Sequence, residues 1–172
     1  MRAPILFLVF LFIVKLSSGQ ADEKVTAIRK LVQAINNDRG YKIKKLDNDY
    51  FTDVKNEAAD NGQELKGYYK DGQLKKIIYT VGLSNCMKTY GYYFSGNNLI
   101  FVFEKEDDYP AKKDGSGPDD SKLVPGFEGR YYIENGKIIQ AKTKGQERSV
   151  ANDNNRFNAD LKGFLEDLKH GR

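Results

Sequence analysis

The sequence predicts an α+β domain in which an antiparallel β-meander of about six strands is flanked by an N-terminal and a C-terminal amphipathic helix. Three observations predict this fold. Apolar residues recur at spacings of three and four near residues 22–37, and again near residues 156–169. Between these segments, a unit of aromatic pair, tight-turn dipeptide and β-rich run occurs three times, which is typical of consecutive hairpins.

The first 19 residues have the pattern of a secretory signal peptide. An unbroken apolar run from Ile5 to Val14 follows Arg2, and small residues occupy 17–19. A helix that spans a bilayer needs roughly 20 apolar residues, so this run is too short to anchor a folded protein. A buried N-terminal helix is the alternative, but the basic start and the small residues favour export. We expect cleavage after Gly19 or one residue later, which leaves a single α+β domain over 20–172.

Charge and cysteine content narrow the setting of the mature chain. Loss of Arg2 and Lys15 from 28 basic residues leaves 26, against 24 acidic residues. This near-neutral balance does not favour nucleic acid or anionic lipid as the main partner, because such binding draws on concentrated positive charge. Cys86 is the only cysteine, so no internal disulfide can form. We therefore expect an exported protein of the bacterial periplasm or cell surface, with no membrane span in the mature chain.

The segments around the hairpins are predicted as follows. The residues at 22–37 form the first helix, after which the apolar period changes to two and predicts a short strand near 41–46. Tyr50, Phe51 and Val54 indicate a turn of helix or irregular chain, followed by a polar loop. The apolar residues of 156–169 form the closing helix, with Asp153 or Asn155 available as its N-cap.

Three tight turns fix the expected hairpins at Asp71-Gly72, Gly96-Asn97 and Asn135-Gly136. Asp-Gly and Asn-Gly are preferred in two-residue turns because both central positions require positive φ. Counting outward from the first and third turns places Tyr68 opposite Lys75 and Tyr132 opposite Ile139.

Each hairpin carries two adjacent tyrosines, whose side chains should point to opposite faces of the sheet. We expect both helices to cover one face, which leaves apolar surface on the other. Tyrosine suits a half-exposed contact surface, since its ring is apolar and its hydroxyl stays hydrated. Coverage of that face by the strand near 41–46 and by the long loop is an equally favoured alternative. The predicted binding surface consists of Tyr68, Tyr69, Tyr92, Tyr93, Tyr131 and Tyr132.

The chain resembles a group of uncharacterised exported bacterial proteins. The likeness is carried by the Gly-Tyr-Tyr-x-Asp-Gly-x-Leu hairpin from Gly67, the Gly-Tyr-Tyr hairpin from Gly91 and the Gly-Arg-Tyr-Tyr-x-x-Asn-Gly-Lys-Ile hairpin from Gly129, and it covers most of residues 22–145. The hairpins also resemble MORN-type repeats, although their spacing is less regular. The resemblance implies no activity and no functional residues.

An acidic, Pro- and Gly-rich stretch predicts a long loop at about 104–126. Its aspartates offer oxygen atoms, which are the ligands that calcium requires, but their spacing does not match an EF-hand. A solvated acidic loop is therefore the favoured interpretation. The aspartates are Asp107, Asp108, Asp114, Asp119 and Asp120.

The sequence predicts no catalytic, cofactor-binding or metal-binding residues. A catalytic Cys86 needs a nearby base, and the only histidine, His170, lies near the C-terminal end. One cysteine and one histidine cannot supply a zinc site. We expect a non-enzymatic exported module that binds an envelope protein or ligand. The alternative is a small extracytoplasmic hydrolase or enzyme inhibitor with a site of scattered residues, since paired carboxylates leave no local signature. The lysines Lys42, Lys44, Lys45, Lys75 and Lys76 are interpreted as solubilising.

Overall fold

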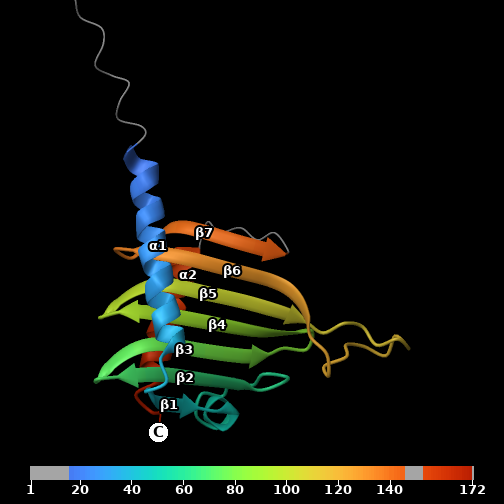
Figure 1. The fold of residues 1–172 in the computed structure, drawn as a ribbon. Coiled ribbons are helices and arrows are strands. Elements are labelled where there is room, and N and C mark those ends of the chain that lie inside the picture. The colour runs from blue at the N-terminus through green and yellow to red at the C-terminus, as the bar shows by residue number, and fades with distance from the viewer. Residues whose placement is uncertain (1–15, 146–152, 172) are drawn as a thin grey trace, which may run out of the picture.

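The computed structural model describes residues 16–145 and 153–171, which form one seven-stranded antiparallel sheet and two long helices (Figure 1). The strands follow one another across the sheet in the order β1 to β7, so the predicted meander is confirmed. Six of the seven strands come from the three predicted hairpins. The additional strand is β1, which pairs with β2 at the edge of the sheet. The bounds are α1 Leu16–Asn37, β1 Lys42–Leu46, a π-helix Tyr50–Val54, β2 Gln63–Lys70, β3 Gln73–Gly82, β4 Cys86–Ser95, β5 Asn98–Asp108, β6 Val124–Glu134, β7 Lys137–Gly145 and α2 Asp153–Asp167.

The two helices lie on opposite faces of the sheet, with α1 in front and α2 behind in Figure 1. Each helix therefore has its own core. Phe157 and Leu168 from the C-terminal segment pack into one cluster with the sheet, whereas Val25 and Ile28 of α1 pack into a second cluster. The expectation that both helices cover the same face is wrong. Alternating strands put apolar side chains on both faces, and one helix on each face buries more of them than two helices on one face.

The three turns lie where the sequence predicts them, but in the first and third hairpins the register differs by one residue beyond the pairs next to the turn. Tyr68 pairs with Lys76, and Tyr132 pairs with Gln140, so the predicted partners are wrong. The reason is a β-bulge in each hairpin, which leaves one extra residue on the second strand. A bulge of this kind brings two successive side chains to the same side. The extra residues are Lys75, Ile100 and Ile139.

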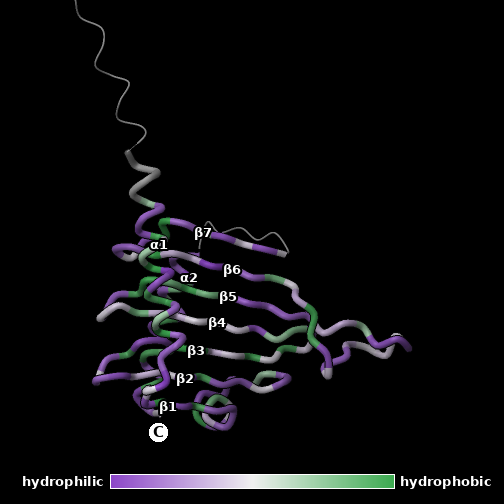
Figure 2. Tube along the Cα trace, in the orientation of Figure 1, coloured by the Kyte–Doolittle hydropathy of each residue, from purple (hydrophilic) through white to green (hydrophobic). Residues whose placement is uncertain are grey.

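The strands are longer than expected next to the acidic loop. β5 continues to Asp108 and β6 begins at Val124, so the loop covers 109–123 rather than 104–126. Figure 2 shows the change along β5 from hydrophobic positions beneath the helices to hydrophilic positions beyond them. Residues 1–15 of the predicted leader lie outside the described residues, and 16–19 belong to α1. Among the described helices, none combines the length and apolar character needed to cross a membrane.

Candidate functional site

Four of the six tyrosines of the predicted binding surface are buried. Tyr92 and Tyr131 belong to the core beneath α2, with 0% and 1% of their surface exposed. Tyr93 and Tyr132 belong to the core beneath α1, with 6% and 3% exposed. Neighbouring tyrosines do point to opposite faces, as predicted. Because a helix covers each face at these positions, these four side chains are core residues and do not line an open surface.

The hydroxyl groups of these core tyrosines contact the helices above them. Tyr93 donates to Oδ1 of Asn36 in α1 at 3.2 Å. Tyr132 accepts a hydrogen bond from Nε of Arg29 at 3.0 Å, and the Arg29 guanidinium lies 5.2 Å from the centre of the same ring. Burial raises the pKa of Tyr93 above its ordinary value. These contacts fix where α1 crosses the sheet.

The remaining pair, Tyr68 and Tyr69, is half-buried. The Tyr68 ring lies edge-on to Tyr41, with 5.8 Å between ring centres, and Nζ of Lys76 lies 4.7 Å from the Tyr68 ring centre. Burial raises the pKa of Tyr69. The six tyrosines are therefore divided among the core beneath α1, the core beneath α2 and the half-buried pair in β2, and they do not lie together on one surface.

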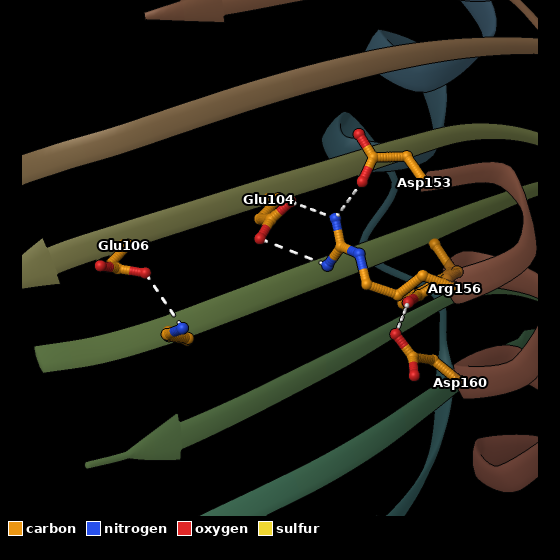
Figure 3. Close-up of polar contacts among 7 residues, drawn as sticks. Glu104, Glu106, Asp153, Arg156 and Asp160 are labelled. Atoms are coloured by element: carbon orange, nitrogen blue, oxygen red, sulfur yellow. Dashed lines mark hydrogen bonds and ion pairs between the residues drawn. The ribbon is translucent and has the colours of Figure 1, made fainter. Parts of the chain in front are cut away.

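A polar cluster lies between α2 and the sheet (Figure 3). Arg156 of α2 donates to both carboxylate oxygens of Glu104, at 2.8 and 3.4 Å, and to Asp153 at 2.8 Å. Glu104 is only 1% exposed. Burial by itself lowers the pKa of Arg156, but its hydrogen bonds to Glu104 and Asp153 outweigh that effect and raise the pKa above its ordinary value.

A second part of this cluster is the contact between Asp160 and Tyr92. The Tyr92 hydroxyl donates to Oδ2 of Asp160 at 3.3 Å. Burial raises the pKa of Asp160, and the nearby positive charge of Arg156 partly opposes that rise. The chemistry of the cluster is that of an ion-pair network that holds the first turns of α2 against the sheet.

Three potential metal ligands meet farther along the same face. The thiol of Cys86 and one oxygen each from Glu106 and Asp108 lie within 4.8 Å of one another. Cys86 is buried at the start of β4. Glu106 also pairs with Nζ of Lys88 at 3.2 Å, so a cation already lies beside this carboxylate. Within the described ranges, this is the group of Cys, Asp and Glu side chains whose potential ligand atoms converge in this way.

The loop aspartates do not join this group, apart from Asp108, which lies at the end of β5. Asp119 accepts hydrogen bonds from Lys122 and Ser121, which lower its pKa to about 2. The Asp114 carboxylate accepts the backbone N–H of Ser116, and this hydrogen bond lowers its pKa. These aspartates stabilise turns within the loop.

An open area lies on the α1 face, beyond the point where α1 crosses the sheet (Figure 1). We call this area the open platform. It consists of two cross-strand rows whose members are paired in register. The first row is Lys45, Lys66, Ile78, Gly91, Phe103, Arg130 and Lys142, and the second is Glu64, Thr80, Thr89, Lys105, Glu128 and Lys144.

The centre of the open platform is apolar and adjoins the Tyr93 ring of the core beneath α1. A Cβ added to Gly91 would meet Ile78 at 3.3 Å and Phe103 at 3.6 Å, so these side chains lie on either side of the glycine on this face. Both side chains are half-buried. The Arg130 guanidinium lies 5.9 Å from the centre of the Phe103 ring.

Basic residues outnumber acidic residues on the open platform, where Lys105 also pairs with Asp107 at 2.6 Å. The open platform holds six basic and two acidic residues. On the opposite face, Glu104 and Glu106 of β5 lie in register rows with Tyr90 and Lys88. The open platform could not be recognised in the sequence because its members come from seven strands far apart in the chain. Strand alternation combined with the hairpin register is the sequence signal that locates them.

The comparisons with known proteins give no relative from which a site can be transferred. No protein-family model, curated protein or solved structure matches this chain.

Proposed function

We propose that the protein is a non-enzymatic, exported binding module of the bacterial cell envelope and that the open platform is its contact surface. The observation that supports this proposal is the position of α1, which covers only one end of its sheet face. The uncovered end presents the half-buried side chains of Phe103 and Ile78 with charged and hydroxyl groups around them, and Phe103 also packs against the core beneath α1. Aromatic residues and arginine, of which the platform has Phe103 and Arg130, are enriched at contact sites.

The platform presents side chains to a partner rather than backbone groups. The strands β2 to β6 each have a neighbour on both sides, so their ladder hydrogen bonds are made within the sheet. A partner on this face must therefore contact residues such as Phe103, Thr89 and Lys105. The sheet also holds these side chains on a rigid support, which reduces the entropy lost on binding.

Lysine footprinting tests the proposal, because the platform and the rest of the surface both carry lysines. The full mature chain is acetylated with and without a solubilised envelope fraction, and labelling is read by mass spectrometry. We expect labelling of Lys66, Lys105 and Lys142 to fall at least threefold. The control lysines are Lys113 in the loop and Lys162 in α2, whose labelling should change by less than a factor of 1.5.

Two results count against the proposal. One is unchanged labelling of the platform lysines at saturating envelope fraction. The other is protection confined to Lys113 or Lys162, which would place the contact surface on the loop or on α2. A Thr89→Glu variant gives a second measurement, since a carboxylate at this half-buried position in the centre of the platform should abolish the protection. Its unfolding midpoint is measured in parallel, so that loss of protection in a folded variant is distinguished from unfolding.

A further inference from the structure

We infer that the open platform binds a linear acidic polysaccharide that runs across the strands. The inference rests on the proposed function, since it names the class of ligand for the same surface. It follows from the charge of the platform, from the spacing of its cations and from the kind of contacts that its side chains can make.

Basic residues are concentrated on the open platform, although the chain as a whole is nearly neutral. Two of the platform lysines, Lys45 and Lys66, share the single carboxylate of Glu64, with 2.6 Å between Nζ of Lys45 and Oε2 of Glu64. Lys142 and Lys144 are exposed and form no ion pair with any carboxylate among the described residues. Lys105 pairs with Asp107 at 2.6 Å and Arg130 pairs with Glu128 at 2.8 Å, so the excess of positive charge comes from the two exposed lysines of β7, and this excess complements a ligand with repeated negative charges.

The cations lie along a line that is long compared with a small ligand. Lys66 in β2 and Lys142 in β7 belong to the same cross-strand row and are separated by five strand spacings. Strands in a sheet lie about 4.8 Å apart, so the row spans roughly 24 Å. Arg130 lies one strand before Lys142. A ligand that contacts both ends of the row must be an extended polyanion.

The uncharged side chains that lie between the cations favour an acidic polysaccharide over other classes of polyanion. Thr80 and Thr89 supply neighbouring hydroxyl groups at the centre of the second row, and Phe103 supplies one ring. Hydroxyl groups and a ring face suit a chain of sugar rings. Single-stranded nucleic acid is bound through a series of aromatic side chains, one for each stacked base, and this platform has a single ring. An acidic peptide in extended form pairs with a sheet edge, whereas this surface is a sheet face.

The test uses one pair of polymers that share a dextran backbone and differ in charge, together with a second acidic polysaccharide that has a different backbone. Affinity electrophoresis of the full mature chain is run in gels that contain dextran sulfate, polygalacturonate or uncharged dextran. We expect retardation by both charged polymers and none by dextran, with the affinity falling at least tenfold between about 50 and 200 mM NaCl. A triple variant, Lys66→Gln with Arg130→Gln and Lys142→Gln, should weaken binding at least tenfold.

A matched triple variant controls for net charge. Lys113→Gln with Lys162→Gln and Lys169→Gln removes the same charge from exposed positions away from the platform and should change affinity by less than twofold. Equal weakening by the two triple variants would show that only net charge matters, and this would overturn the inference. Retardation by dextran, absence of retardation by both charged polymers, or tighter binding to oligothymidylate or to anionic lipid vesicles would also overturn it. Platform protection by the envelope fraction without binding to the charged polymers would reject the inference and leave the proposed function standing.

Discussion

Tyr92 and Tyr93 are consecutive residues of β4, yet their hydroxyl groups bind different helices on opposite sides of the sheet. Tyr92 donates to Asp160 of α2, and Tyr93 donates to Asn36 of α1. One dipeptide thus connects the two helical layers through the middle strand of the sheet. The equivalent pair in β6, Tyr131 and Tyr132, is divided between the same two cores.

The first prediction concerns the structural role of these tyrosines. Tyr92→Ala should lower the free energy of unfolding by about 3–5 kcal/mol, because it removes a fully buried ring and leaves a cavity. Tyr68→Ala, which loses an edge-on contact at a half-buried position, should cost about 1 kcal/mol. Urea unfolding measures both. Equal costs for the two variants would contradict the burial difference.

The second prediction concerns the buried ion pair. Arg156→Met leaves Glu104 buried without its bidentate partner, and we expect a loss of about 3 kcal/mol of stability. Arg130→Met provides the control, since Arg130 pairs with Glu128 on the open platform. Ion pairs at the protein surface contribute about 0–1 kcal/mol to stability. Chemical denaturation near neutral pH compares the two. A smaller loss for Arg156→Met than for Arg130→Met would show that the network does not hold α2 in place.

The third prediction compares two glycines. Gly136 has a φ of 73° in the third turn, a conformation that strains other residues, so Gly136→Ala should cost about 1 kcal/mol. Gly163 lies inside α2 with open space where a Cβ would point, and Gly163→Ala should stabilise the protein by about 1 kcal/mol. Thermal unfolding should therefore shift in opposite directions for these two variants. A shift in the same direction would contradict the backbone argument.

The fourth prediction concerns alkaline pH. Burial raises the pKa of Tyr79 to about 12, compared with an ordinary value of 10, and burial also raises the pKa values of Tyr92 and Tyr131. Groups with a raised pKa in the folded state contribute stability that is fully present below pH 10 and is lost as the pH rises toward 12. Tyr79→Phe should reduce the slope of stability against pH in this interval. The measurement is urea unfolding at a series of pH values, and an unchanged slope would contradict the prediction.

Local sequence determined the elements of this fold. The dipeptides Asp71-Gly72 and Asn135-Gly136 fix two turns because their residues adopt positive φ with little strain, and the structure has positive φ at all four positions. The apolar period likewise predicts both helices, which the structure places at 16–37 and 153–167. These features depend on neighbours in the chain, which is why they can be deduced without a structure.

Only the tertiary structure decided which face each helix covers. Because the helices cover opposite faces, the tyrosines of β4 and β6 are core residues and do not form a binding surface. The helical repeat of apolar residues predicts that α1 has an apolar side, but it does not predict which face of the sheet that side packs against. The bulges at Lys75, Ile100 and Ile139 also depend on pairing between strands. A shift of one residue changes the face on which a side chain lies. The open platform is therefore not apparent from a nearly neutral composition, because the register of seven strands places its cations on one face and Glu104 and Glu106 of β5 on the other.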